Sequence, residues 1–262
     1  MIKNRLKKIK LIHNLYNRFR IWSIVNSNHN SNYLISQLER TIPNIDDQYN
    51  SVNINSNYIR IKIRYLHAFQ IKMVFNYLNI NKVKRIIDIG DSSGNHILYL
   101  KKLLNKKIEY VSINNDYNAI IKIRNKGLIA HHDDAELFVM DYFHVELKND
   151  SIIICFETLE HLENPIRFLK GLKQSNVRSI IITVPYLKKS RINLNYEQGN
   201  TPEDIHIFEL SPKDWRKIFK YAGWNIVYED IYLQYPKRYK WILKYYWRRF
   251  DFEGFYGVCL NK

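Results

Sequence analysis

The sequence has few cysteines and no long apolar run. Its 262 residues include two cysteines, Cys155 and Cys259, each inside a short apolar stretch typical of a buried strand. We interpret both as reduced thiols of an intracellular, cytoplasmic protein; the alternative is a disulfide between neighbouring strands, which a cytosolic chain would rarely keep. No run is long enough to span a bilayer, and the basic start lacks the apolar block of a secretory signal.

Acidic residues are missing from both ends of the chain, where basic residues gather. Residues 1–26 contain seven lysines and arginines, residues 234–249 contain six, and neither segment has Asp or Glu. Together they carry 13 of the 16 net positive charges. Such ends suit an anionic partner: a phosphorylated substrate, a nucleic acid, or the inner face of a membrane to which the protein is peripheral. The alternative is general lysine enrichment with no ligand behind it.

The spacing of apolar residues predicts helices over 1–25, 33–40 and 58–78. The first is amphipathic, so it either packs on the domain or lies on an anionic membrane face. The remainder of the first 57 residues is loop rich in Asn and Ser. We therefore expect a basic helical extension over residues 1–57 and one larger domain over residues 58–262.

Strands alternate with helices along that larger domain. The predicted strands are 85–89, 108–113, 137–140, 151–156, 179–184 (ended by Pro185), 224–233 and 255–260. The predicted helices are 95–104, 117–126, 165–174 and 212–222. This alternation implies an α/β fold with a doubly wound, mostly parallel, seven-stranded, Rossmann-like sheet and helices on both faces. The last two strands lack a helical crossover, which allows one of them to run antiparallel.

The stretch over residues 83–100, VKRIIDIGDSSGNHILYL, joins a strand to a helix through a glycine-bearing turn. Such a turn directs backbone N–H groups and a helix N-terminus at a ligand, which indicates a nucleotide-like cofactor. A dinucleotide fingerprint is incomplete, since Ser92 and Asn95 stand where its other two glycines belong, and no P-loop Gly-Lys-Ser/Thr follows.

The same stretch resembles the first motif of the class I S-adenosylmethionine-dependent methyltransferases, usually D/E-x-G-x-G-x-G. Asp88, Gly90 and Gly94 match it, and Ser92 replaces the middle glycine. The resemblance covers roughly residues 61–262, where LEHLENP, IITVP, HIFELS and YAGW follow in the family's order. It implies S-adenosyl-L-methionine as cofactor. The LEH segment resembles that of a subgroup acting on small molecules, quinone precursors and sugars.

The resemblance also implies which residues surround the cofactor. The family's acidic residue that binds both ribose hydroxyls corresponds to Asn114, whose amide can accept one hydrogen bond and donate another, with Asp116 two residues on. Its carboxylate that accepts from the adenine amino group corresponds to Asp141; the alternative is a solvated turn carboxylate. The full set is Asp88, Gly90, Asp91, Ser92, Gly94, Asn114, Asp141, Tyr142 and Phe156.

Methyl transfer needs little catalytic equipment, because the sulfonium is already electrophilic and the enzyme mainly aligns the reactants. A hydroxyl or amine acceptor still has to lose a proton, for which we expect His161 first and His206 second, with Glu157 and Glu160 as further options. The alternatives are structural: His161 would pack against or cap the helix that follows it, and His206 would hold the substrate loop by a hydrogen bond. Residues 131–134 (HHDD) look like a metal tract, but adjacent loop residues rarely converge on one ion, so we expect no metal.

We expect residues 186–210 and 234–252 to form the part of the site that binds the methyl acceptor. The alternative for the second segment is an aromatic-rich helix that packs on the sheet. The predicted reaction is methyl transfer to a small molecule or to a nucleotide- or lipid-linked sugar, in the context of surface polysaccharide biosynthesis. One alternative is an RNA methyltransferase, favoured by the charge of +16. Nucleic acid is the less favoured partner, since no RNA-binding module or N-P-P-Y tetrapeptide is present. The other is a non-catalytic scaffold, favoured by Ser92 and Asn114.

Overall fold

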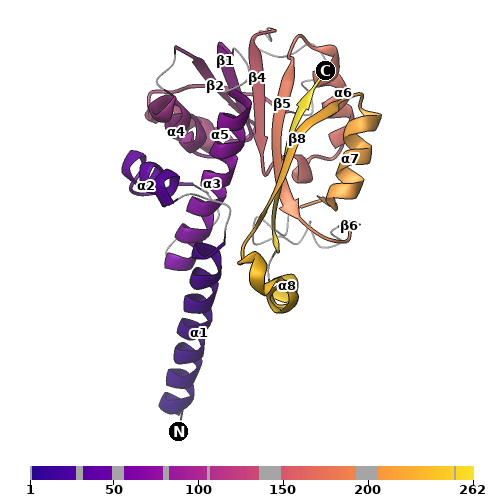
Figure 1. Cartoon of the computed structure of the whole chain (residues 1–262). Helices are drawn as coiled ribbons and strands as arrows, with labels where there is room; N and C mark the ends of the chain where they lie inside the picture. Colours follow the sequence, from indigo (N-terminus) through magenta and orange to yellow (C-terminus); the bar gives the residue numbers. More distant parts are fainter. Residues whose placement is uncertain are drawn as a thin grey trace.

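A seven-stranded sheet forms the centre of the protein, seen here in a computed structural model that describes residues 2–27, 32–48, 56–78, 83–104, 107–135, 149–192, 206–250 and 252–262 (Figure 1). The strands stand in the order β3-β2-β1-β4-β5-β9-β8. Their bounds are β1 (Arg85–Ile89), β2 (Glu109–Asn114), β3 (Ile129–His132), β4 (Ser151–Phe156), β5 (Ser179–Tyr186), β8 (Asn225–Leu233) and β9 (Gly254–Asn261).

The sheet is parallel except for one strand. β3, β2, β1, β4 and β5 pair in parallel, whereas β9 runs antiparallel to both of its neighbours, β5 and β8. The predicted doubly wound, mostly parallel seven-stranded sheet is thus confirmed, and β9 is its antiparallel strand. All six other strands therefore end at the same edge, where side chains that follow them are brought together.

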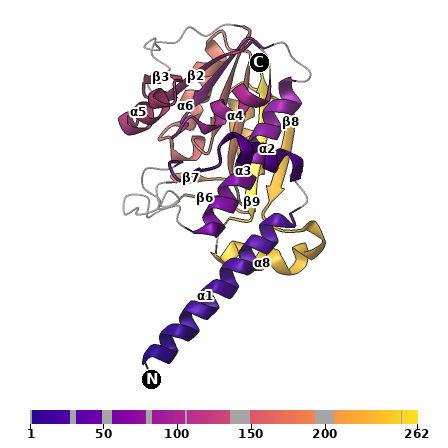
Figure 2. The ribbon, with the colours of Figure 1, turned by 90° about the vertical axis from the view of Figure 1, so that its left-hand side faces the viewer.

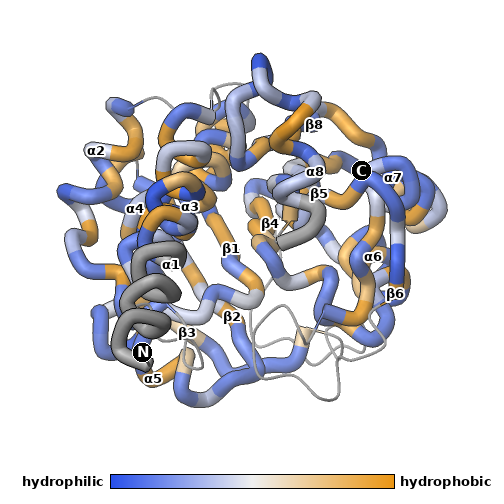
Figure 3. Tube along the Cα trace, turned by 90° about the horizontal axis from the view of Figure 1, so that it is seen from below, coloured by the Kyte–Doolittle hydropathy of each residue, from blue (hydrophilic) through white to orange (hydrophobic). Residues whose placement is uncertain are grey.

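Helices cover both faces of the sheet, because alternate strand residues point to opposite sides. Ile86 packs with α3 (Asn57–Leu78), α4 (Asn95–Leu103) and α5 (Tyr117–Asn125). Its neighbour Ile87 packs on the opposite side with α6 (Pro165–Gln174) and α7 (Pro212–Tyr221). Figure 3 shows hydrophobic residues concentrated along the central strands.

The two basic ends of the chain lie side by side. α1 (Ile2–Val25) projects away from the sheet, and α8 (Lys240–Phe250) lies beside the end of α1 nearest the body (Figure 2). The Phe19 and Tyr246 rings are 4.9 Å apart, and Trp247 Nε1 donates to Ser23 Oγ over 3.1 Å. No described helix combines the length and the apolarity needed to cross a membrane.

Three elements differ from the predictions. The third strand is β3; the stretch predicted for it, 137–140, lies outside the described residues. β5 continues through Pro185, which faces Phe255 of β9. Thr183 accepts from the Glu157 amide on the β4 side, and Pro185, two residues on, turns its nitrogen to the same side. The proline is tolerated because β4 pairs with β5 no further than Thr183, so no β4 acceptor is left without an N–H donor. A two-stranded ribbon of β6 (Arg191–Ile192) and β7 (Phe208–Glu209) was not predicted.

Both cysteines are free and buried, which confirms the prediction of reduced thiols. Cys155 lies in β4 and Cys259 in β9, and β5 separates these two strands. The alternative, a disulfide between neighbouring strands, is therefore wrong. Burial raises the pKa of the Cys259 thiol to about 12, so it stays protonated at neutral pH.

Candidate cofactor and acceptor site

The turn between β1 and α4 is shaped by two glycines in the left-handed region, Gly90 at φ +90° and Gly94 at φ +77°. A Cβ on Gly90 would lie 2.2 Å from Oγ1 of Thr158. That hydroxyl donates to the Ile89 carbonyl at 3.2 Å and the Phe156 carbonyl at 3.0 Å, which ties the ends of β1 and β4 together. The turn therefore needs glycine at position 90 for its backbone angle and for Thr158.

A buried chain of polar side chains lies under this turn. His96 Nδ1 is 3.3 Å from Asp88 Oδ2, and His96 Nε2 is 3.0 Å from Gln70 Oε1. Gln70 uses its amide N–H to donate to Thr183, so its oxygen accepts from His96 Nε2–H. Burial alone would lower the pKa of His96, but the hydrogen bond to Asp88 and the charges of Asp91 and Asp88 outweigh it and raise that pKa, which favours donation from Nδ1–H to Asp88 Oδ2. Burial, with a contribution from the charge of Asp91, raises the pKa of Asp88 to about 7, against the opposing hydrogen bond to His96.

Two carboxylate oxygens beside the turn are buried and have no hydrogen-bond partner among the described residues: Oδ1 of Asp88 and Oδ2 of Asp91. The other oxygen of Asp91 accepts from the Ser93 amide at 3.0 Å. Unpartnered acceptors of this kind are costly unless a ligand satisfies them. A cationic ligand group such as an ammonium suits them.

The segment before α3 covers the same turn. Oε1 of Gln48 accepts from Ser93 Oγ at 3.0 Å and from Asn95 Nδ2 at 2.7 Å, and Ser92 Oγ donates to the Gln48 carbonyl. Asp47 forms an ion pair with Lys126 at 2.7 Å. Nothing in the sequence around Gln48 predicted this contact, which only the tertiary fold reveals.

The end of β2 is also joined to the turn. Asn114 Nδ2 donates to the Asp91 carbonyl at 3.0 Å, and its Oδ1 accepts from the Asp116 amide at 2.7 Å. Asp116 uses its carboxylate to cap α5 by accepting from Asn118 at 2.8 Å. Asn114 therefore lies where the sequence predicted, whereas Asp116 serves the helix.

Two carboxylates other than Asp141 directly follow the described strand β3. β3 ends at His132, so Asp133 and Asp134 come directly after it, and the Asp133 amide donates to the Asn114 carbonyl at 3.1 Å. Asp141 and Tyr142 lie outside the described residues, and their cofactor contacts stay predictions. A four-residue strand with two histidines gives a weak apolar signal, which is why the more apolar 137–140 was preferred.

A second cluster lies just beyond Thr158. The 3-10 turn Leu159–His161 carries Glu160 and His161, and the Ile207 amide donates to the Glu160 carbonyl at 2.8 Å, which brings His206 alongside. The rings of His161 and His206 are 4.5 Å apart. Burial, followed by the charge of Glu157, raises the pKa of Glu160 well above its usual range. The two histidines predicted as proton acceptors thus meet.

The remaining predicted residue is Phe156, the last residue of β4. It lies between the polar side chains under the glycine turn and the cluster of Glu160, His161 and His206. Its ring lies 5.0 Å from that of His96 in an edge-to-face arrangement. The next residue, Glu157, has φ +49°, the left-handed region that a non-glycine side chain adopts only at a cost. Backbone strain at the end of a central strand is frequent in active sites. The described members of the predicted set therefore gather where β1, β2 and β4 end.

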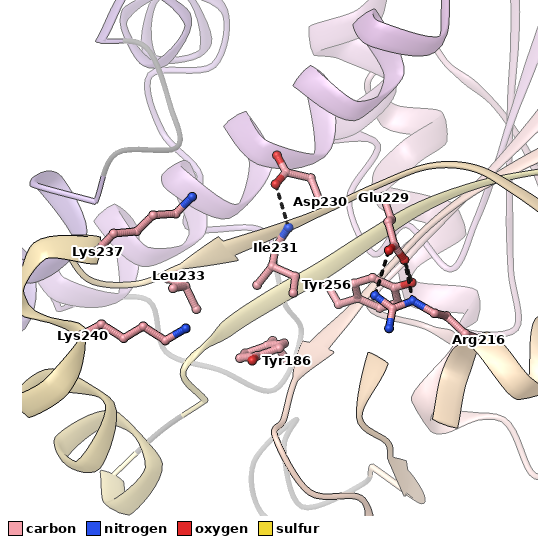
Figure 4. A pocket seen from close by; sticks show the side chains of 9 residues that line it. All are labelled: Tyr186, Arg216, Glu229, Asp230, Ile231, Leu233, Lys237, Lys240 and Tyr256. Carbon is pink, nitrogen blue, oxygen red and sulfur yellow. Dashed lines mark hydrogen bonds and ion pairs between the residues drawn. The ribbon is translucent and has the colours of Figure 1, made fainter. Parts of the chain in front are cut away.

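A pocket of about 320 Å³ lies farther along the sheet, beside β5 and β8 (Figure 4). Tyr186, Ile231 and Leu233 form its apolar wall, and Lys237 and Lys240 reach over it from the segment that begins α8. Arg216 lies at its far end and is held by both carboxylate oxygens of Glu229 at 2.9 and 2.8 Å. Outside the Arg216–Glu229 pair, its lining holds two lysines and one carboxylate, Asp230, so the excess positive charge suits an anionic small molecule.

Comparison with known proteins gives the same architecture. A family model described as a methyltransferase domain matches residues 63–229. Among curated proteins, none matches the chain. An S-adenosylmethionine-dependent methyltransferase of Leishmania major superposes with a TM-score of 0.55 at 11% identity, covering 87% of this chain and 82% of that one.

Two further solved structures share this fold, one a methyltransferase and the other a cyclase. An O-methyltransferase from a polyketide multienzyme of Brevibacillus brevis, in complex with S-adenosyl-L-homocysteine, gives a TM-score of 0.55 at 11% identity, over 78% of this chain and 74% of that one. The [4+2]-cyclase SpnF gives 0.55 at 9% identity, over 88% and 93%. Likeness at this level shows the fold and leaves the reaction to be argued from the site.

Proposed function

This chain belongs to the methyltransferase-domain family, and we propose that it transfers a methyl group from S-adenosyl-L-methionine to a small hydroxyl- or amine-bearing acceptor. The observation that carries the proposal is the pair of buried, unpartnered oxygens of Asp88 and Asp91 beside the turn of Gly90. The ammonium group of this cofactor would satisfy both acceptors, which supports its binding at the turn.

The described residues around the turn fit that cofactor. Asp88 and Asp91 would accept from its ammonium, and Asn114 keeps one amide N–H and one carbonyl lone pair for a ribose hydroxyl. Asp133 is the carboxylate nearest the end of β3 and would accept from the adenine amino group. When bound, the cofactor supplies an electrophilic methyl group whose sulfur retains the bonding electron pair after transfer.

The cluster of Glu160, His161 and His206 would activate the acceptor. It follows Thr158, which touches the glycine turn, so it lies one short turn beyond the proposed cofactor site. The acceptor O–H or N–H gives up its proton to this cluster, which passes it to water through the half-buried side of His161. Because alignment supplies most of the rate, loss of one cluster residue should lower kcat more than it changes cofactor affinity.

We propose a nucleotide- or lipid-linked sugar as the acceptor class. The pocket beside β8 supports this, because Lys237 and Lys240 can neutralise a diphosphate while Tyr186 offers a surface for a sugar or base ring. The resemblance of the LEH segment to that of a small-molecule and sugar subgroup points to the same class.

Mass spectrometry of the purified full chain tests the cofactor directly. We expect S-adenosyl-L-methionine or its demethylated product to co-purify, and calorimetric titration to give a dissociation constant in the micromolar range. No heat at millimolar cofactor would contradict the proposal and favour the scaffold alternative.

In the same calorimetric assay, Asp133→Ala should weaken cofactor binding by about 1–3 kcal/mol, the cost of leaving a buried donor unpaired. If Asp141→Ala weakens binding instead, the carboxylate predicted from the sequence is the correct one.

We further infer that the joined basic ends lie on an anionic lipid surface. α8 exposes two aromatic rings, Trp241 at 68% and Tyr245 at 64% of their surface. The adjacent exposed cations are Lys237, Arg238 and Lys240. Amphipathic aromatic rings flanked by cations are typical of side chains at the headgroup layer of an anionic membrane.

Vesicle flotation tests this surface. We expect the chain to float with vesicles containing phosphatidylglycerol and to sediment with pure phosphatidylcholine, with binding weakened by salt. Replacing both Trp241 and Tyr245 by Ser should reduce flotation several-fold, whereas Tyr33→Ser, an equally exposed tyrosine on α2 (Asn32–Thr41), should not. Equal flotation of all variants would exclude α8, and salt-sensitive binding to RNA alone would favour the nucleic-acid alternative.

A further inference from the structure

Two groups of side chains in the described part of the chain have the spacing of a metal site: Asp88 with Asp91 and His96, and Glu160 with His161 and His206. The first group is closed, because it is fully buried and the nitrogen of His96 that faces it, Nδ1, is already bonded to Asp88. The second has an open side, since His161 is only half-buried. It therefore has the features of a site that binds an ion and still reaches a substrate.

We infer that Glu160, His161 and His206 bind a first-row divalent metal ion. One ligand atom from each residue lies within 4.8 Å of the others, and His206 Nε2 is 3.9 Å from Glu160 Oε1. Metal–ligand bonds of about 2.1 Å place two ligands on one ion roughly 3–4 Å apart, so small side-chain movements suffice. We expected no metal from the sequence because only the adjacent residues 131–134 were considered, whereas His161 and His206 are far apart in the sequence.

The carboxylate of Glu160 is the second, independent observation. Glu160 is 0% exposed, and neither of its oxygens has a hydrogen-bond partner among the described residues. A buried carboxylate without partners is strongly unfavourable unless it holds a proton or binds a cation, and a metal ion bound here would displace that proton. His161 and His206 are the nitrogen ligands nearest to it.

The surroundings of His206 match those of a metal-binding histidine. Its Nε2 faces Glu160, while its Nδ1 lies 3.4 Å from Oε1 of Glu209 on β7. This contact is an ion-pair distance without hydrogen-bond geometry among the described residues, and a small rotation of the ring would let Nδ1–H donate to Glu209 and leave Nε2 as the ligand. Arg191 of β6 forms an ion pair with Glu209, which holds that carboxylate in place. The short ribbon of β6 and β7 thus supports the site.

The donor set favours Mn²⁺ or Zn²⁺ over Mg²⁺, because imidazole nitrogens suit transition metals whereas Mg²⁺ prefers oxygen ligands. Three protein ligands leave coordination positions open. An acceptor hydroxyl bound there would lose its proton more readily, since a divalent ion lowers the pKa of a coordinated oxygen. With all three side chains on the ion, that proton would pass directly to water on the open side of the site. This role rests on the proposed methyl transfer, whereas the metal site itself rests on the geometry of the three side chains.

Calorimetric titration of the chelator-stripped full chain with MnCl₂ and ZnCl₂ tests the site. We expect one ion per chain for wild type, and affinity at least about 100-fold weaker for Glu160→Gln and His206→Gln, which each remove a ligand. Glu209→Gln should weaken affinity by about 10–100-fold through the orientation of His206. His132→Gln removes an exposed histidine outside the cluster and should leave the affinity unchanged.

Parallel titrations with S-adenosyl-L-methionine separate this proposal from the proposed function. Each variant should keep wild-type cofactor affinity, which also shows that it is folded. Wild type that binds no ion, or Glu160→Gln that binds as tightly as wild type, would overturn the metal site even if the cofactor binds. Stoichiometric metal without cofactor binding would leave the metal site standing and overturn the methyltransferase proposal.

Discussion

Gly90→Val should abolish detectable binding of S-adenosyl-L-methionine. Residue 90 has φ +90°, which costs a β-branched side chain about 1–3 kcal/mol. Its new Cβ would also lie 2.2 Å from Thr158 Oγ1, so the turn after β1 and the turn after β4 would have to separate. Since both turns border the proposed site, we expect at least a 100-fold loss of affinity, or about 2.7 kcal/mol, by calorimetry.

Gly127→Val is the matched control. Gly127 has φ +71°, a comparable backbone penalty, but a Cβ there meets nothing within 4 Å. It should lower the melting temperature slightly and leave cofactor affinity within about twofold of wild type, a difference below about 0.5 kcal/mol. If Gly90→Val binds as wild type does, or if Gly127→Val loses binding equally, the assignment of the turn to the cofactor is wrong.

The stability of the protein should fall from pH 4 to pH 7 through Asp88. Burial raises its pKa to about 7, far above the ordinary value near 3.9 that it has in the unfolded chain. In this window the native state holds a proton that the unfolded state has released, so the contribution to stability is complete below pH 4 and is lost as the pH rises through 7. The slope is about 1.4 kcal/mol per pH unit.

Asp88→Asn should remove that slope, because the amide keeps the shape without titrating. Above pH 7 the variant no longer carries a buried charge. We therefore expect its unfolding free energy, relative to wild type, to rise by a few kcal/mol between pH 4 and pH 8. Urea unfolding at several pH values measures this difference, and groups unaffected by the substitution cancel. A constant difference across the range would show that Asp88 titrates normally in the native protein.

Much of the fold could be predicted from residue pattern. The long apolar strands β1, β4 and β5 and the helices capped by Asn164 and Ser211 carry strong local signals, and both caps accept the expected backbone N–H. β3 escaped prediction because its four residues depend on pairing with β2 more than on their own hydrophobicity. The ribbon of β6 and β7 escaped for the same reason, since two-residue strands have no period to detect.

The site was predictable only where its residues follow a motif. Asp88, Gly90 and Gly94 could be located from their spacing in the sequence, because a turn from a strand into a helix needs glycine at fixed positions. Gln48 could not, because its contact with Ser93 is a property of how the segment before α3 packs. The meeting of His161 with His206 depends on the hydrogen bond from Ile207 to Glu160, which no local pattern specifies.

Gln48 has a consequence for how this chain differs from its relatives. The family match begins at residue 63, so the amide that satisfies Ser93 and Asn95 belongs to a segment that the shared domain does not include. A fragment trimmed to that domain would leave both polar groups to water. Two polar groups of the glycine turn thus depend on a residue outside the matched domain, so a shortened chain would expose a turn that the full chain keeps covered.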